Sequence, residues 1–413
     1  MSKGTTQHIF ATFLLNKGLF FAAACSLVLI TACGGGDDIQ VTNLSSPTPT
    51  NTPAPLPYAV LYSFTGGADG ANPEAALVSD GAGNFYGTTM NGGSSGKGTV
   101  FKITAAGVET VLYSFSGGAD GASPVAGLVR DGAGDFYGTT FSGGTSRNNG
   151  TVFKIDSSGV KTVLYRFAGG SDGSLPYGRL VSDGAGHFYG TTFRGGTSDY
   201  GTVFKITAAG AKTVLHNFAD GADSVSPQAN LVIDGAGNFY GTTAEGGTSG
   251  LGTVFKIDSG GVETVLHNFA GGADGSRPYA GLVSDGAGNF YGTTLEGGTS
   301  GLGTVFKIDS SGAATVLHSF AGGHGDGAGP GAALVRDGAG NFYGATVEGG
   351  TSNTGTVFKI TSSGVITVLY SFAGGGDAAN PIGGLLIDGG YLYGTTVNGG
   401  TSNQGTVFRL PMQ

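Results

Sequence analysis

The stretch LVSDGAGNFYGTT at residues 77–89 decides the fold, because its last part returns at a nearly fixed interval along the chain. The phrase Tyr-Gly-Thr/Ala-Thr occurs seven times, with its tyrosine at Tyr86, Tyr137, Tyr189, Tyr240, Tyr291, Tyr343 and Tyr393. Successive tyrosines are 51, 52, 51, 51, 52 and 50 residues apart. Such a period is the signature of a repeat architecture, whose units do not fold alone. The 413 residues therefore predict one array rather than two or three independent domains.

Each unit contains four short runs rich in β-branched and aromatic residues, bounded by Gly, Asp, Asn or Ser. In the first unit they cover residues 75–79, 85–89, 98–103 and 110–115. This pattern is typical of strands joined by hairpins, and no segment sustains a helical period. Four strands in about 50 residues, seven times over, predict an all-β, seven-bladed β-propeller with four antiparallel strands per blade. A β-solenoid is the alternative, but solenoids need atypical end caps, and this array ends with its last unit intact.

The two ends of the array indicate how the ring closes. The fourth-strand phrase occurs first at residues 60–64, before any other strand, and the chain ends on a third strand at 405–410. We therefore expect the strand at 58–64 to complete the last blade, which would otherwise leave an exposed edge. The sequence predicts a propeller over residues 58–410, followed by a short tail at 411–413.

The composition restricts the partners. The net charge is −9, and the chain without Lys3 and Lys17 would carry −11, which disfavours nucleic acid or an anionic membrane surface. The two cysteines, Cys25 and Cys33, both precede the array, so the repeats contain neither disulfides nor thiolate metal sites.

The N-terminus reads as an export signal over residues 1–32. The two lysines flank an apolar run at 18–32, which has the length of a signal-peptide core and is too short for an ordinary membrane span. Ile-Thr-Ala-Cys at 30–33 resembles a bacterial lipobox, which implies that Cys33 is lipidated and that the protein is displayed at the cell surface, on the outer membrane. A plain secretory signal is the alternative. The Gly/Ser/Thr/Pro-rich residues 33–57 predict an extended tether.

The repeat also resembles a known family. Leu-Val-x-Asp-Gly-x-Gly-Asn-Phe-Tyr-Gly-Thr-Thr, then Gly-Gly-Thr-Ser and Gly-Thr-Val-Phe-Lys-Ile, are similar to the GloVer tandem repeat of bacterial surface proteins. The resemblance covers residues 58–410. Members of that family are similar in carrying variable anchoring signals, and the family implies no established activity. A looser similarity to NHL-type propellers rests on the Asp-Gly-x-Gly-Asn-Phe-Tyr segment alone.

Two sets of acids and a set of histidines recur in the array. One aspartate of each unit sits in the first hairpin, where an Asx turn or a pair with the third-strand lysine is expected and a cation-binding ring is the alternative. These are Asp80, Asp131, Asp183, Asp234, Asp285, Asp337 and Asp388. A second aspartate precedes the inter-unit proline. Calcium prefers several clustered oxygen ligands, so one acid per loop gives little support for a calcium site. These aspartates are Asp69, Asp120, Asp172, Asp223, Asp274, Asp326 and Asp377.

The histidines His216, His267 and His318 replace a fourth-strand tyrosine in three successive units. Because the outer strands of neighbouring blades diverge, we expect half-buried side chains in a tyrosine position rather than a shared metal ion. The sequence predicts no metal site and no cofactor, with calcium as a minor alternative.

Departures from the repeat are the better guide to function, because a binding site should differ between units. The third unit places Tyr177 and Arg179 at the start of its inner strand, and adds Arg194 and Tyr200 nearby. Arg147 lies in the corresponding loop of the neighbouring unit, whereas the next three units carry an acid in the Arg194 position: Glu245, Glu296 and Glu348. These residues predict a basic, aromatic binding surface on one face, with drift among exposed loops as the alternative.

The sequence contains no Gly-x-Ser-x-Gly elbow with a partnered histidine, and no catalytic residue is predicted. We therefore expect a monomeric, lipid-anchored, non-catalytic binding module for a glycan, a peptide or a protein. One alternative is a lactonase-, lyase- or hydrolase-like enzyme with its site at the mouth of the central channel. A structural or assembly role is the other.

Overall fold

The computed structural model describes residues 28–29, 42–43, 57–219 and 224–412. The chain forms two compact units, Met1–Pro55 and Leu56–Gln413. In the first unit, β1 (Val28–Leu29) pairs antiparallel with β2 (Thr42–Asn43). Most of the predicted signal peptide, Cys33 and nearly all of the predicted tether lie outside the described residues, so those predictions stay predictions.

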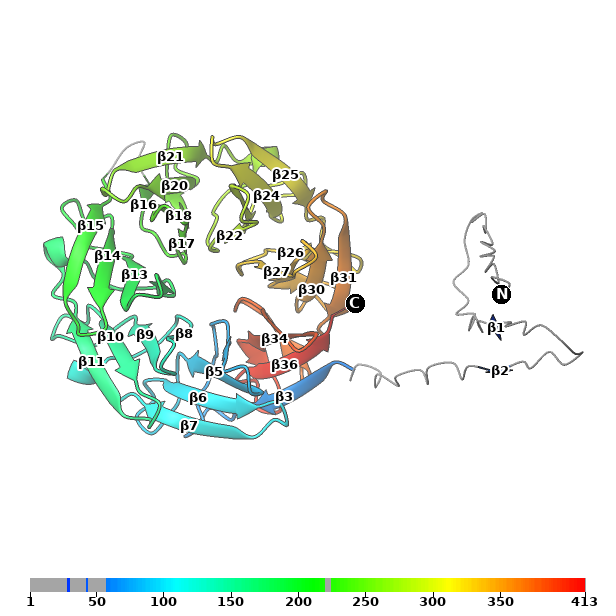
Figure 1. Cartoon of the computed structure of the whole chain (residues 1–413), viewed down its shortest axis with the longest axis horizontal. Coiled ribbons are helices and arrows are strands. Elements are labelled where there is room, and N and C mark those ends of the chain that lie inside the picture. Colours follow the sequence, from blue (N-terminus) through cyan, green and yellow to red (C-terminus); the bar gives the residue numbers. More distant parts are fainter. Residues whose placement is uncertain (1–27, 30–41, 44–56, 220–223, 413) are drawn as a thin grey trace, which may run out of the picture. The chain divides into compact units, whose positions relative to one another are not determined.

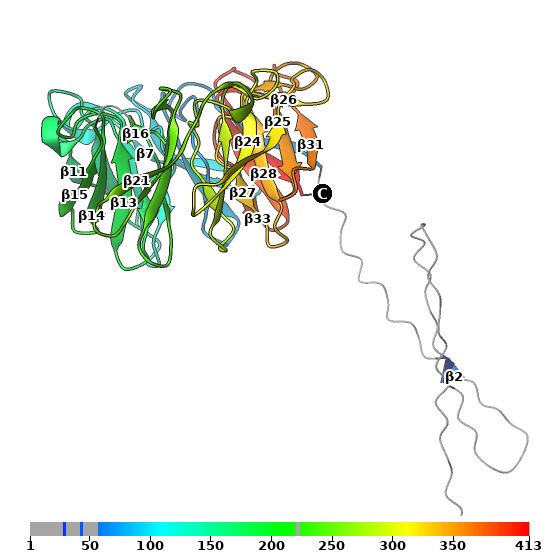
Figure 2. The same cartoon turned by 90° about the horizontal axis from the view of Figure 1, so that it is seen from above.

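The second unit is a closed ring of seven four-stranded antiparallel sheets, which confirms the predicted propeller (Figure 1). Seen from the side, the ring is a short cylinder, wider than it is deep (Figure 2). The innermost strands of blades 1 to 7 are β4 (Val78–Ser79), β8 (Val129–Arg130), β12 (Val181–Ser182), β17 (Val232–Ile233), β22 (Val283–Ser284), β27 (Val335–Arg336) and β33 (Leu386–Asp388). The second strands are β5 (Asn84–Thr89), β9 (Phe136–Thr140), β13 (His187–Thr192), β18 (Phe239–Thr243), β23 (Asn289–Thr294), β28 (Phe342–Thr346) and β34 (Tyr391–Thr396).

The two outer strands of each blade are longer than the innermost strand, and the register between them shifts by a bulge in every blade. The third strands are β6 (Thr99–Thr104), β10 (Thr151–Ile155), β14 (Thr202–Thr207), β20 (Thr253–Ile257), β24 (Thr304–Asp309), β30 (Thr356–Ile360) and β36 (Thr406–Pro411). The fourth strands are β7 (Glu109–Ser114), β11 (Lys161–Arg166), β15 (Lys212–Asn217), β21 (Glu263–Asn268), β25 (Ala314–Ser319), β31 (Ile366–Ser371) and, in blade 7, β3 (Ala59–Ser63).

Short elements occur in the loops between the blades. Three two-stranded ladders pair β16 (Ser224–Val225) with β19 (Glu245–Gly246), β26 (Gly327–Ala328) with β29 (Glu348–Gly349), and β32 (Ala378–Ala379) with β35 (Asn398–Gly399). Single 3₁₀ turns are η1 (Gly118–Asp120), η2 (Gly170–Asp172) and η3 (Gly272–Asp274). We call the face that carries these loops the loop face.

The ring closes as the sequence predicts. β3, from the start of the array, pairs antiparallel with β36 from its end, in a register that includes Val60 opposite Phe408. Immediately before β3, the Tyr58 hydroxyl donates a 2.6 Å hydrogen bond to Asp377, and its ring stacks on Tyr370 of blade 6. The N-terminal strand therefore joins blade 7 and also contacts blade 6.

The repeated Tyr-Gly-Thr-Thr phrase packs one blade against the next. In blade 1, Tyr86 lies 4.3 Å from Phe136 of blade 2, measured between ring centroids. Gly87 is required because a Cβ atom there would come within 2.6 Å of the Phe101 ring. The hydroxyl of Thr88 donates to the carbonyl of Ala126 in blade 2, and Thr89 shares a hydrogen bond with Thr99 of the third strand. Each residue of the phrase thus has a structural role.

The inner strands are shorter than predicted, because contacts with the neighbouring blade replace part of the pairing within the sheet. In blade 1, only Val78 and Ser79 pair with the second strand, although residues 75–79 were expected to form a strand. The carbonyl of Ala75 accepts a hydrogen bond from Thr395 of blade 7 instead of joining the ladder. The segment before β4 is therefore held by the neighbouring blade.

A repeated aromatic contact completes the hydrophobic core between the blades. The Phe64 ring, directly after β3, meets Phe101 of blade 1 edge to face, with 5.1 Å between ring centroids, and both side chains are fully buried. The same contact recurs at the other six interfaces, with centroids 5.2 or 5.3 Å apart, between Phe115 and Phe153, Phe167 and Phe204, Phe218 and Phe255, Phe269 and Phe306, Phe320 and Phe358, and Phe372 and Phe408. Aromatic pairs of this geometry stabilise the folded protein by more than the burial of their apolar surface alone would give.

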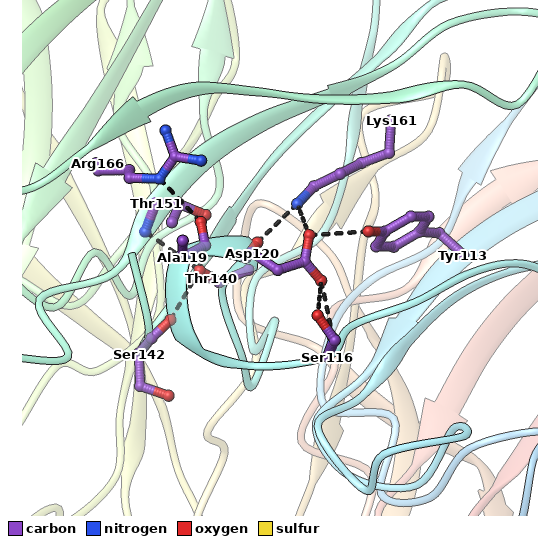
Figure 3. A network of polar contacts seen from close by, with 9 residues as sticks. All are labelled: Tyr113, Ser116, Ala119, Asp120, Thr140, Ser142, Thr151, Lys161 and Arg166. Atoms are coloured by element: carbon purple, nitrogen blue, oxygen red, sulfur yellow. Dashed lines mark hydrogen bonds and ion pairs between the residues drawn. The ribbon is translucent and has the colours of Figure 1, made fainter. Parts of the chain in front are cut away.

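The aspartate of the loop between blades joins two outer strands. Asp120 accepts hydrogen bonds from the Tyr113 hydroxyl at 2.8 Å, the Ser116 amide at 2.8 Å and the Lys161 amine at 2.5 Å (Figure 3). Burial alone would raise the pKa of Asp120, but these bonds and the nearby positive charge lower it overall. Equivalent bonds from a tyrosine or histidine of the preceding fourth strand reach Asp69, Asp172, Asp274, Asp326 and Asp377. Asp223 lies outside the described residues.

The aspartate of the first hairpin forms the predicted Asx turn. In blade 1, Asp80 Oδ1 accepts from the amides of Ala82 and Asn84, at 2.8 and 3.1 Å, and Oδ2 accepts from the Tyr86 hydroxyl at 3.3 Å. In blades 2 to 6 the third-strand lysine lies over the tyrosine ring of the phrase, as Lys154 does over Tyr137 at 5.6 Å. A tyrosine thus stands between the acid and the base that were expected to pair directly.

Candidate functional site

The innermost strands enclose a central cavity of about 550 Å³. In each blade, the first and third residues after the inter-blade proline line it. The first residues lie nearest the loop face and are Glu74, Val125, Tyr177, Gln228, Tyr279, Gly331 and Ile382. The third residues are Ala76, Gly127, Arg179, Asn230, Gly281, Ala333 and Gly384. Valines of the innermost strands line the cavity towards the opposite face.

Arg179 is a large residue among the third positions after the prolines, most of which carry small side chains. Of the seven third positions, five are Ala or Gly, and the exceptions are the neighbours Arg179 and Asn230. The Asn230 side-chain oxygen accepts a 2.6 Å hydrogen bond from the Arg179 main-chain amide. This bond ties the inner segments of blades 3 and 4 together and fixes the backbone that carries the arginine.

The guanidinium group of Arg179 has no partner among the described residues. Its Nε atom is fully buried and donates no hydrogen bond there, and no ion pair reaches the side chain. Burial lowers the pKa of Arg179, yet an arginine stays charged at physiological pH. The residue as a whole is half-buried and lines the cavity, so its guanidinium is available to a ligand.

Tyr177 lies two residues before Arg179 on the same segment. Its side chain is 38% exposed, although it is a large apolar group. The ring meets Phe141 of blade 2 edge to face, with 5.8 Å between centroids, which holds its orientation. Burial raises the pKa of Tyr177, and the charges of Glu74 and Tyr279 add to the effect. These three side chains, from blades 1, 3 and 5, all line the mouth of the cavity.

Glu74 is the only carboxylate in the lining of this cavity, within residues 57–219 and 224–412. Burial raises its pKa, and no hydrogen bond or ion pair to its side chain is found there. The cavity lining therefore contains one acid, Glu74, and one base, Arg179, which form no ion pair with each other.

The structure brings together two of the five residues predicted to bind ligand. Tyr177 and Arg179 line the cavity, but Arg194, Tyr200 and Arg147 do not. Arg194 is exposed and lies over the Phe193 ring at 5.0 Å, Tyr200 packs against the core between blades 3 and 4, and Arg147 is exposed in the loop before β10. Sequence reasoning missed Glu74, Gln228 and Tyr279, although the position after each proline would have revealed them.

The three histidines are half-buried, as predicted, and each also contacts an acid, which the sequence analysis did not predict. His267 contacts Asp274 and His318 contacts Asp326, each at 3.1 Å, and His216 contacts Glu263 at 3.0 Å. Across the described part of the chain, no three His, Cys, Asp or Glu side chains are grouped so that they could hold a metal ion. No helix among the described residues is long and apolar enough to cross a membrane.

Solved structures share this fold at low sequence identity. A putative 6-phosphogluconolactonase from Bacteroides uniformis is 17% identical with a TM-score of 0.50, over 75% of this chain and 87% of that one. A puromycin-hydrolyzing peptidase from Mycobacterium tuberculosis is 13% identical with a TM-score of 0.52, over 87% of this chain and 55% of the peptidase. At such identities the likeness shows the fold alone.

A search of curated protein sequences finds no significant match. The sequence profile of the Gloeobacter/Verrucomicrobia repeat, in contrast, matches residues 50–235 and 226–413, which together span the whole array. The chain therefore belongs to the Gloeobacter/Verrucomicrobia repeat family.

Proposed function

We propose that this protein is a lipid-anchored, non-catalytic binding propeller that receives its ligand at the loop-face mouth of the central cavity. The observation that carries the proposal is the unpartnered guanidinium of Arg179 in the cavity wall. In a repeat protein, residues shared by all units serve the blade, and Arg179 occurs in one unit of seven. A charge that has no protein partner in the cavity wall is well explained by a ligand that neutralises it.

The lining favours binding over catalysis. Among the described residues it contains one carboxylate, Glu74, and no His, Cys or Lys. Acid–base hydrolysis normally uses two groups with opposed roles, and a metal-dependent lactonase needs several oxygen or nitrogen ligands together. Tyr177, Gln228 and Tyr279 at the mouth are instead the aromatic and neutral polar side chains typical of a binding pocket.

The ligand is a glycan, a peptide or a partner protein outside the cell. A glycan array and a pull-down from culture medium, both with the full chain, test this. We expect a ligand whose binding falls at least tenfold in Arg179→Ala and is unchanged in Arg130→Ala, an exposed arginine outside the lining. Turnover of a bound lactone or ester, lost in Glu74→Gln, would favour the enzyme alternative instead.

The anchor is tested separately. We propose export by residues 1–32, lipidation at Cys33 and display on the outer membrane by the tether at 33–57, on the basis of the apolar run and the Ile-Thr-Ala-Cys sequence. Cys33→Ser should move the protein from the membrane fraction to the soluble fraction, whereas Cys25→Ser should not. Unaltered fractionation of Cys33→Ser would refute the anchor. It would leave the binding proposal intact.

A further inference from the structure

We propose that the ligand is an acidic carbohydrate, whose sugar carboxylate pairs with Arg179 and whose ring lies against Tyr177. This inference rests on the proposed binding function and names its ligand class. The argument uses three features of the cavity: an unpartnered guanidinium, a fixed and half-exposed aromatic ring, and a set of neutral hydrogen-bonding groups around them.

Arg179 is built to meet a planar anion. A guanidinium offers two parallel N–H donors that match the two oxygens of a carboxylate. The backbone of Arg179 is fixed by Asn230, and the side chain passes Gly127 of blade 2, where a Cβ atom would lie 3.5 Å from its Cδ. The remaining third positions are Ala or Gly, so space for a ligand group remains beside the arginine.

A single carboxylate fits better than a phosphate dianion. Glu74 lines the same cavity, and burial raises its pKa, which shows that a negative charge is already disfavoured at its position. Glu74 and Tyr177 are both first residues after an inter-blade proline and both line the mouth of the cavity. A second negative charge on the ligand would be repelled there, whereas a hydroxyl could donate to the glutamate.

The other groups at the mouth suit a sugar. Tyr177 presents 38% of its surface, and its contact with Phe141 fixes the direction of its ring, so it provides a preformed apolar platform. Gln228 and Tyr279 line the mouth with neutral donors and acceptors of the kind that bind hydroxyl groups. A ligand with one carboxylate and several hydroxyls on a ring therefore satisfies the whole lining, whereas a peptide would leave much of it unused.

The test compares two matched probes by isothermal titration calorimetry on the full chain. Galacturonate carries a single carboxylate, and galactose is its neutral counterpart. We expect galacturonate to bind at least tenfold more tightly than galactose. Arg179→Met should abolish that difference, Arg179→Lys should restore part of it, and Tyr177→Ala should weaken both probes. Arg130→Met is the control, and circular dichroism should show that every variant is folded.

Three outcomes would overturn the inference. Equal binding of both probes, unaffected by Arg179→Met, would refute the carboxylate and leave carbohydrate binding intact. Capture of a peptide or protein that depends on Arg179, with neither saccharide bound, would refute the carbohydrate and preserve the proposed function. If no saccharide, peptide or protein binds in these assays or on the array, the proposed function fails together with the inference.

Discussion

The amine of Lys161 in blade 2 lies 2.5 Å from the carboxylate of Asp120, which belongs to the loop that follows blade 1 (Figure 3). The lysine side chain is only 3% exposed, although it carries a charge. Its Nζ atom also donates to the Asp120 carbonyl at 2.6 Å and lies over the Tyr113 ring at 5.1 Å. The blades differ at this contact, because the amino acid at the position equivalent to Lys161 is not the same in every blade.

Removing the Lys161 amine should destabilise the interface between blades 1 and 2. Lys161→Met keeps most of the side-chain volume but leaves Asp120 with one partner fewer in a partly buried site. We expect a loss of about 1–3 kcal/mol in the free energy of unfolding, below the 3–5 kcal/mol typical of a fully buried pair. Urea unfolding followed by circular dichroism measures it. Lys97→Met, at an exposed lysine, is the control and should change stability by less than about 0.5 kcal/mol.

At the interface that closes the ring, the position equivalent to Lys161 carries an acid instead of a base. Here Glu109 of blade 1 faces Asp69, whose carboxylate already accepts a 3.0 Å hydrogen bond from Tyr62 of β3. Glu109 Oε1 is buried without a hydrogen bond. Burial, followed by the charge of Asp69, raises the pKa of Glu109 from 4.5 to about 7.

Stability should therefore fall with rising pH because of Glu109. A carboxyl with a raised pKa holds its proton more tightly when folded, so its penalty is absent below pH 4.5 and complete above about pH 7. After a discount for partial exposure to solvent, we expect about 1–2 kcal/mol across that window. Glu109→Gln should remove this part of the pH dependence in urea unfolding at pH 4.5 and pH 8, and the exposed Glu245→Gln should not. Parallel pH profiles for wild type and Glu109→Gln would contradict the assignment.

The glycine of the repeated phrase should be irreplaceable. Gly241→Ala would place a Cβ atom 2.5 Å from the Phe255 ring and 3.1 Å from Leu231, both in the core of blade 4. Overpacking of this kind typically costs about 1–3 kcal/mol. Gly235→Ala is the matched control, because a Cβ atom there meets nothing within 4 Å and its φ is not positive. Thermal unfolding of the two variants should separate them clearly, and equal midpoints would show that the ring yields to the extra methyl group.

The blades and their closure were predictable because both depend on local pattern. The period fixes the number of blades, and the early copy at residues 60–64 shows which strand is displaced. The site was predictable only in part. Arg179 stands out because it breaks the small-residue rule of the third positions, and Tyr177 lies two residues before it on the same inner segment, where side chains point to the axis.

The rest of the site depends on convergence from separate blades. Glu74, Gln228 and Tyr279 lie far apart in sequence and meet only because the ring brings every post-proline residue to one axis. Arg147 and Arg194 share their unusual charge, but they sit in loops whose side chains do not reach the cavity. The partners of the inter-blade aspartates were also hidden, because Lys161 follows Asp120 by 41 residues.

The free protein should become more stable when Arg179 loses its charge. Arg179→Met keeps a long side chain in the wall and removes an unpartnered guanidinium, so we expect a gain of about 1 kcal/mol. That gain would raise the melting temperature by about 1–3 °C in a domain of this size. Calorimetry of ligand-free protein measures it. Clear destabilisation would show that the arginine supports the fold.

Ring closure by the N-terminal strand should be essential to the stability of the whole propeller. Replacing residues 57–64 with a Gly-Ser segment of equal length removes the pairing of β3 with β36, the Phe64–Phe101 contact and the Tyr58–Asp377 bond. Blade 7 would then present the unpaired edge of β36, and such an edge promotes aggregation. We expect a melting temperature lower by at least ~10 °C, given the several kcal/mol that these contacts contribute. Size-exclusion chromatography should also show oligomers. The same replacement at residues 44–51, in the predicted tether, is the control and should leave both measurements unchanged. A monomer with wild-type stability after loss of residues 57–64 would mean that three strands suffice for blade 7, and that β3 does not hold the ring closed.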